Sequence, residues 1–297
     1  MITLDVITIG RSSVDLYGVQ VGGRLEDMAS FRKYVGGSPT NMAIGAARLG
    51  LRAGLITRVG DEHMGRFIRE TLAAEGVDVR GVGTDPERLT ALVLLGIRDR
   101  DRFPLIFYRE NCADMALSEA DIDPALIAEA GCVTVTGTHL SHPRTEAAVL
   151  KALRLARGNG ARTALDIDYR PNLWGLAGHG AGESRFVESA AVTAKLQRNL
   201  HLFDLIVGTE EEFHIAGGST DTMEALRAVR RLTAAMLCAS AARWGRRRSL
   251  TIFRTPWTTA CPAPVSRSRA ITCSAPATGS WPGCCAAGCA ASRGRPR

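Results

Sequence analysis

The first stretch of this chain that could do chemistry is a Gly-Gly pair followed, four residues on, by an asparagine. Gly36 and Gly37 lack side chains, so a ligand can lie against their backbone. Ser38 is a good helix N-cap, and the proline after it is tolerated in a first helical turn, which predicts a helix over residues 38–49. Asn41 would lie near the N-terminus of that helix, where backbone N–H groups favour polar or anionic ligands. The pattern indicates a ligand site, with a plain loop as the alternative.

Asp15 is the second candidate. Residues 2–9 alternate enough to form a β-strand, and residues 10–15 read as the turn that follows it. In open α/β sheets, ligands bind just beyond the carboxyl ends of strands, where this carboxylate would lie. A turn that the aspartate itself stabilises is an equally good interpretation.

Arg109 is the third candidate, within the polar cluster of residues 108–114. Its planar guanidinium can hold a carboxylate through two parallel N–H donors. The cluster has too specific a composition for a plain turn, although a solvated loop is the alternative. Arg109 is therefore a candidate for binding an acidic substrate.

Two strand-like segments precede this cluster, at residues 89–97 and 103–108. Together with hairpin-like material near the N-terminus they predict a small sheet that stands off the main body. This sheet would be built from about 12–35 and 88–112. As a lid, it would exclude water from a transfer reaction.

Three further strands each lead into polar or charged residues, and predicted helices at 143–157 and about 183–200 lie between them. The strands are residues 132–137, 161–168 and 203–208, followed by Thr138-His139, by Tyr169 to Asn172 and by Thr209 to Glu212. Alternation of strands and helices is typical of a parallel sheet covered on both faces. The polar residues then converge at one edge of the sheet, which predicts an active-site crevice. A single histidine such as His139 is usually a satisfied loop residue.

Composition limits the alternatives. The first residues read as a β-strand rather than a signal peptide, and no apolar run is long enough to span a bilayer, so we expect a cytoplasmic protein without membrane contact. The net charge of +7 suggests nucleic acid, but residues 238–297 contain ten arginines and no other charged residue type, so the rest of the chain carries −3. We therefore expect no nucleic-acid partner. Neither a His/Cys metal site nor a G-x-x-x-x-G-K-[ST] phosphate loop is present.

The pattern Gly-Gly-x-x-x-Asn-x-Ala, with Gly50 and Gly60 at fixed offsets, resembles the N-terminal signature of the ribokinase-like (PfkB-type) carbohydrate kinases. The resemblance covers residues 2 to about 236. It narrows to the 5-dehydro-2-deoxygluconokinases of inositol breakdown through FPLIFYRENCADMAL, DIDYRPNLW and DLIVGTEEEFHIAGG. It implies a three-layer α/β/α sandwich with a small β lid.

The same resemblance implies an activity and roles for single residues. The activity is ATP-dependent phosphorylation of the primary hydroxyl of 5-dehydro-2-deoxy-D-gluconate, with Mg²⁺ as the second cofactor. Asp15, Gly36, Gly37 and Asn41 would hold sugar hydroxyls, and Arg109 the substrate carboxylate. Arg170 would lie near the transferred phosphoryl group, and Glu212 would help to organise hydrated magnesium. Thr209 replaces the asparagine of the family's Asn-x-x-Glu motif.

One motif that the resemblance requires is missing. In this family a late Gly-Ala-Gly-Asp supplies both the anion-binding glycine amides and the catalytic base. Here residues 273–279 read Cys-Ser-Ala-Pro-Ala-Thr-Gly instead. No catalytic base can therefore be identified in this chain.

A shift of reading frame explains the missing motif. Each shifted codon consists of the third base of one codon and the first two bases of the next codon. Read in this way, residues 273–291 can spell LGAGDGFMAGLLRGWLRG, and residues 253–266 can spell PDTLDDGLPGPGFP. Only the wobble bases are free in this exercise, so chance is a poor explanation. We interpret the chain as a kinase domain, residues 1–236, joined to an aberrant tail, residues 237–297, by a single-base deletion in the gene or in its sequencing. The tail is expected to be disordered or poorly packed.

The sequence therefore predicts a sugar-acid kinase that is impaired in this form. One alternative is another PfkB-type kinase, such as one for 2-keto-3-deoxygluconate. Another is a non-catalytic sugar-acid binding protein that kept the crevice. The expected partners are the sugar acid and ATP, and lid edges of this family commonly pair between subunits, which suggests a homodimer.

Overall fold

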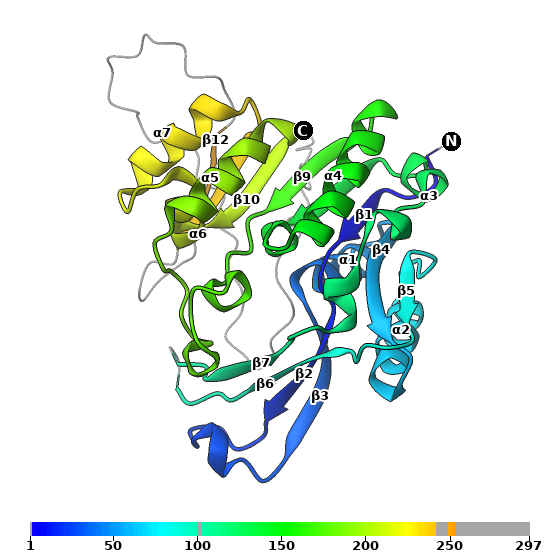
Figure 1. Ribbon diagram of the computed structural model, residues 1–297, viewed down its shortest axis with the longest axis vertical. Coiled ribbons are helices and arrows are strands. Elements are labelled where there is room, and N and C mark those ends of the chain that lie inside the picture. Colours follow the sequence, from blue (N-terminus) through cyan, green and yellow to red (C-terminus); the bar gives the residue numbers. More distant parts are fainter. Residues whose placement is uncertain (1, 100–101, 242–248, 254–297) are drawn as a thin grey trace, which may run out of the picture.

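The fold is built around an eight-stranded, mainly parallel β-sheet, seen in a computed structural model that describes residues 2–99, 102–241 and 249–253 (Figure 1). Its strand order is β12-β11-β10-β9-β8-β1-β4-β5, and only the β11–β12 pair is antiparallel. The strands are β1 (Val6–Ile9), β4 (Ala53–Gly60), β5 (Val82–Asp85), β8 (Cys132–Thr136), β9 (Arg162–Asp166), β10 (Leu205–Thr209), β11 (Met236–Ala241) and β12 (Ser249–Phe253).

Helices lie on both faces of this sheet, because its strands are apolar on both sides. On β4, Leu55 and Val59 belong to the apolar cluster that includes α1 (Ser38–Arg48) and α2 (His63–Ala74). Ile56 faces the opposite side and belongs to the larger cluster. That cluster takes in α3 (Pro124–Ala128), α4 (Pro143–Gly158), α5 (Ala190–Asn199), α6 (Glu210–Gly217) and α7 (Thr222–Leu232). The result is the expected three-layer α/β/α sandwich.

The covering is uneven at the β10–β11 end of the sheet. Ile206 and Leu237 point into the larger cluster and are buried. The alternate side chains Leu205, Val207 and Met236 point to the other face and stay partly exposed, with Met236 at 37%. Neither apolar cluster of the described residues includes these three side chains.

The lid is a separate four-stranded sheet that stands off the carboxyl-end side of the main sheet (Figure 1). Its order is β3-β2-β6-β7, in which β2 pairs in parallel with β6 and the other two pairs are antiparallel. The strands come from the two stretches named above for a lid: β2 (Ser13–Gly18), β3 (Phe31–Gly36), β6 (Ala91–Leu95) and β7 (Leu105–Tyr108).

Three details differ from the sequence prediction. Asp15 lies inside β2 rather than in a turn after β1, because the chain enters the lid sheet directly at Ser13. The N-cap of α1 is Gly37 instead of Ser38, since Gly37 has a φ of 100° and Ser38 already belongs to the helix. Helix α5 starts at Ala190 rather than near residue 183, because Ser189 caps it through a hydrogen bond to Val192 N–H.

The sheet also continues beyond the predicted boundary at residue 236. β11 pairs with β10 as far as Ser240, and β12 pairs with β11. Strand pairing uses backbone groups, which any sequence without proline supplies. The segments 242–248 and 254–297, which hold most of the predicted aberrant tail, lie outside the described residues. In the described part of the chain, no helix has the length and apolarity needed to cross a membrane.

Candidate active site

The carboxyl ends of β1, β8 and β9 bring a buried ion pair together at the edge of the sheet where the crevice is predicted. Arg11, just after β1, donates from Nε and Nη2 to the two carboxylate oxygens of Asp168, each at 3.2 Å. Thr138, after β8, donates its hydroxyl to Asp168 Oδ2, also at 3.2 Å. The charges of Arg11 and Arg170 hold the pKa of Asp168 below its usual range, although burial alone would raise it. Asp168 is therefore a fixed carboxylate that organises three strand ends.

Asp166, at the end of β9, is the second carboxylate of the site and is half-buried. Burial, and then the negative charges of Asp168 and Glu212, raise its pKa to about 7. The Ser38 hydroxyl donates to Asp166 Oδ2 and joins the first turn of α1 to the crevice. This bond gives Ser38 a role other than the predicted helix cap, because its side chain binds Asp166.

Glu212 completes the carboxylate cluster at the start of α6. It forms a capping box with Thr209: the Thr209 N–H donates to Glu212 Oε2 at 2.7 Å, and the Glu212 N–H donates to the Thr209 hydroxyl at 3.3 Å. Only 6% of Glu212 is exposed, and burial raises its pKa. Threonine thus fixes the glutamate by local hydrogen bonds at the position where the family has asparagine.

Asp15 reaches the Gly36–Gly37 turn from the lid strand β2. The Ser13 hydroxyl donates to Asp15 Oδ1 at 2.8 Å, and burial raises the pKa of Asp15. A Cβ atom on Gly36 would collide with the Asp15 carboxylate, and one on Gly37 with the Arg11 carbonyl oxygen. On the side where a Cβ atom would point, the glycines therefore make room for the protein's own polar groups. From the sequence, we expected these glycines to leave their backbone open to a ligand. Asn41 lies exposed on the first turn of α1.

Arg109 is buried beside the crevice, on the segment that leaves lid strand β7. Its Nε donates to Asp114 Oδ2 at 2.7 Å, and both residues are less than 10% exposed. Its Nη2 has no hydrogen-bond partner among the described residues, and neither has Asp114 Oδ1. Arg109 also lines a cavity of about 500 Å³, together with side chains that include Arg88, Asn111 and Asn172. Arg170 is half-buried at the start of the loop after β9 and approaches its neighbour's carbonyl oxygen at 3.5 Å.

His139 departs from its expected role as a satisfied loop residue. The turn after β8 buries it completely, and neither ring nitrogen has a hydrogen-bond partner among the described residues. Burial, and then the positive charges of Arg109 and Arg11, lower its pKa to about 3. Its position directly after a strand end was visible in the sequence, but its burial was not.

The low pKa of His139 predicts that the protein loses stability in acid. A histidine in the unfolded chain has a pKa near 6.5, so between pH 6.5 and about 3 His139 is protonated in the unfolded chain and neutral in the folded chain. The free energy of unfolding should therefore fall as the pH falls through this window. Relative to His139→Gln, the unmodified protein should lose roughly 2 kcal/mol between pH 7.5 and pH 5.0, measured by urea unfolding. Equal losses in both proteins would contradict the assignment.

Comparison with known proteins identifies the class that this fold and crevice define. Residues 3–237 match the pfkB family carbohydrate kinase, and the chain belongs to this family. The 5-dehydro-2-deoxygluconokinase of Halalkalibacterium halodurans is 35% identical over 218 residues, which are 73% of this chain and 62% of the relative. The enzyme of the same name from Geobacillus kaustophilus is 39% identical over 211 residues, 71% of this chain and 59% of the relative. The chain thus spans about three fifths of the length of these relatives.

Solved structures agree on the fold. The PfkB protein from Polaromonas sp. JS666 has a TM-score of 0.71 and 28% identity, covering 84% of this chain and 79% of its own. A putative Ribokinase II from E. coli, solved in complex with ATP and Mg²⁺, has a TM-score of 0.71 and 21% identity, covering 86% of this chain and 79% of its own. The second likeness concerns the fold alone.

Proposed function

We propose that the chain derives from an ATP-dependent kinase that phosphorylates the primary hydroxyl of 5-dehydro-2-deoxy-D-gluconate, and that in its present form it binds the acid but transfers phosphate poorly. The observation that carries the substrate class is Arg109, a buried guanidinium with an unpartnered Nη2 beside a cavity next to the crevice. A carboxylate is the ligand that completes such a group. The names of the relatives support the particular sugar acid.

In this proposal the lid and the first helix hold the sugar. Asp15 is half-buried and keeps the capacity to accept hydrogen bonds from hydroxyl groups, and Asn41 offers an exposed amide on the first turn of α1. Gly36 and Gly37 fix the backbone between these two side chains. Arg109 would bind the acid end, which leaves the far hydroxyl of the substrate for the crevice. Arg170 would contact the transferred phosphoryl group there.

The carboxylates fit a hydrated magnesium ion better than a directly bound one. Mg²⁺ prefers oxygen ligands and gives up its waters reluctantly, so it is often held through only one or two carboxylates. Among the described residues, no cluster of three His, Cys, Asp or Glu side chains could hold a metal ion directly. Glu212, fixed by its capping box, would contact the waters of the ion. When bound with ATP, the ion would neutralise charge on the phosphates.

What this chain lacks is a base for the sugar hydroxyl. Asp168 is tied to Arg11, and Asp166 accepts from Ser38, so both are committed within the crevice. No acidic residue follows Glu224. We infer that residues 1–236 are the kinase domain and that residues 237–297 replace its C-terminal part. A cytoplasmic homodimer joined at the lids is part of the same proposal.

The substrate is tested on a frame-corrected protein with ATP and magnesium. We expect a higher kcat/KM for 5-dehydro-2-deoxygluconate than for 2-keto-3-deoxygluconate, measured side by side. The reverse order would replace the proposed substrate by the other acid. The second candidate is a sugar-acid binding protein, which the absence of the motif from the 297-residue chain favours. Acid binding without ATP consumption, by the 297-residue chain and by the corrected protein alike, would support it.

A further inference from the structure

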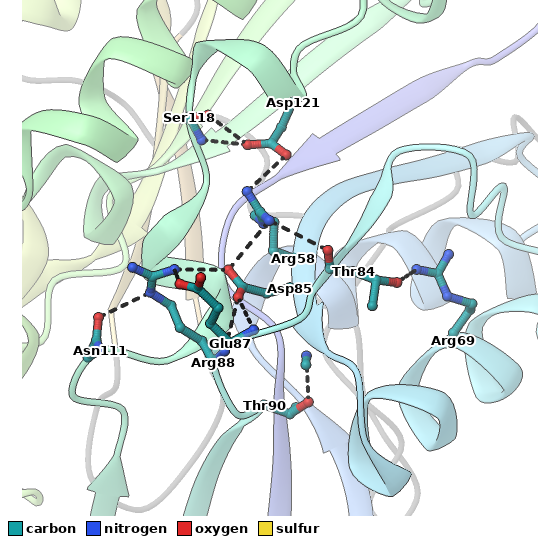
Figure 2. A network of polar contacts seen from close by, with 11 residues as sticks. Arg58, Arg69, Thr84, Asp85, Glu87, Arg88, Thr90, Asn111, Ser118 and Asp121 are labelled. Carbon is teal, nitrogen blue, oxygen red and sulfur yellow. Dashed lines mark hydrogen bonds and ion pairs between the residues drawn. The ribbon is translucent and has the colours of Figure 1, made fainter.

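A network of polar side chains joins the β4–β5 edge of the main sheet to the loop that carries Arg109 (Figure 2). Its centre is Asp85, at the end of β5, which is only 2% exposed. Asp85 Oδ2 lies 3.4 Å from Arg58 Nη2 and 3.3 Å from Arg88 Nη1. Its other oxygen accepts the backbone N–H groups of Glu87 and Arg88, both at 3.0 Å. Arg88 is therefore held at its backbone and at its guanidinium by one buried carboxylate.

The network continues from Arg88 to the Arg109 loop. Arg88 Nε donates to Asn111 Oδ1 at 3.1 Å (Figure 2). Asn111 has a φ of 50°, a left-handed conformation that asparagine tolerates better than most residues. Next to this bond, the Ala113 N–H donates to the Leu89 carbonyl oxygen at 2.9 Å. The turn between Arg109 and Asp114 is thus tied to residues 88 and 89 by a side-chain bond and a backbone bond.

These contacts fix the direction of the Arg109 guanidinium from two sides. Asp114 holds its Nε edge, and the Arg88–Asn111 bond holds the turn that carries both Arg109 and Asp114. Arg88, Arg109 and Asn111 also line the same cavity of about 500 Å³. A bidentate bond to a carboxylate requires the guanidinium plane to be aligned with it, so a small rotation of the turn weakens the bond.

We propose that Arg88 is a positioning residue for Arg109, and that the chain Asp85–Arg88–Asn111 sets the preference of this protein for acidic over neutral sugars. Arg88 acts through Asn111 and need not touch the substrate. This inference rests on the proposed role of Arg109 as the carboxylate-binding group.

The test compares Arg88→Gln with Arg69→Gln in the 297-residue chain. Arg69 is a matched control: it is similarly half-buried and donates to the Val82 carbonyl oxygen at 2.6 Å and to the Thr84 hydroxyl at 2.9 Å, on the far side of the same network (Figure 2). Calorimetric titration with 5-dehydro-2-deoxygluconate and with its neutral analogue, in which an alcohol replaces the acid, gives the preference. Arg88→Gln should weaken acid binding by about 10-fold or more and leave the neutral analogue within about 2-fold. Arg69→Gln should leave the ratio unchanged.

Two further measurements separate the possible failures. Hydrogen exchange of residues 109–114 should speed up in Arg88→Gln and stay unchanged in Arg69→Gln, and this readout needs no substrate. If exchange is unchanged, or if Arg109→Ala abolishes the acid preference while Arg88→Gln keeps it, the positioning role is wrong. If Arg109→Ala itself leaves the preference intact, the proposed role of Arg109 fails and the inference falls with it.

Discussion

The 297-residue chain is expected to transfer phosphate from ATP at least about 10²-fold more slowly than its frame-corrected counterpart. Loss of a general base typically slows a reaction ~10²–10⁴-fold, and loss of one anion-hole donor ~10²–10³-fold. In this family both groups come from the Gly-Ala-Gly-Asp motif, which is absent from this sequence, and such losses need not multiply. We expect neither Asp168 nor Asp166 to replace the base, because Asp168 is paired with Arg11 and Asp166 accepts a hydrogen bond from Ser38.

The same comparison should show a difference in stability. Parallel sheets are normally covered on both faces, yet Leu205, Val207 and Met236 remain partly exposed on one face of β10 and β11. In the alternative frame, residues 273–291 can spell the missing motif followed by an amphipathic helix, which could cover such a face. Covering it should stabilise the corrected protein by several kcal/mol, since burial of each large apolar side chain contributes roughly 1.5–3 kcal/mol.

The experiment is to resequence the gene, to express both versions, and to compare ATP turnover and thermal melting. Mass spectrometry of the purified chains identifies each reading frame. An additional variant of the corrected protein, with the motif's aspartate changed to asparagine, is the matched control: it keeps the restored packing and removes only the base. If the 297-residue chain, confirmed by mass, turns over ATP like the corrected protein, the frame-shift account of its activity is wrong.

The second large effect is expected from Arg109→Ala in the frame-corrected protein. Binding of the sugar acid should weaken by ~2–5 kcal/mol, because a buried, charge-assisted pair is lost and the acid is left without a counter-charge. Binding of a neutral analogue should change far less. Since Asp114 would also lose its partner, thermal melting must be measured alongside calorimetric titration, so that a loss of folded protein is not read as a loss of affinity.

A matched control for this variant is Arg154→Ala. Arg154 is an exposed arginine of α4 that pairs loosely with Glu119, at 3.5 Å, and does not line the cavity beside Arg109. Arg154→Ala removes the same charge from the protein at a position away from the proposed binding site. An equal loss of affinity for the acid and the neutral analogue in Arg109→Ala would reject the carboxylate-binding role.

The local signals in the sequence predicted much of this protein. Alternation of strands and helices indicated the three-layer fold, and the Gly36–Asn41 pattern with the motifs around Arg109 and Arg170 indicated the family. These features succeed because they depend on neighbouring residues: an apolar strand, a glycine turn and a helix start are each visible within about a dozen positions. The placement of polar residues after strands also predicted one crevice, since parallel strands end at the same edge.

Only the tertiary structure decided which side chains meet there. Arg11 pairs with Asp168 across 157 positions, and Ser38 reaches Asp166 across 128. Nothing local to either residue encodes such a partner. His139 is likewise a plain polar residue in the sequence, but the fold buries it completely, and burial together with the charges of Arg109 and Arg11 lowers its pKa. The charge state and the burial of a side chain depend on which segments the fold brings together. A single sequence without homologues therefore indicates the candidate residues but does not indicate which of them form pairs.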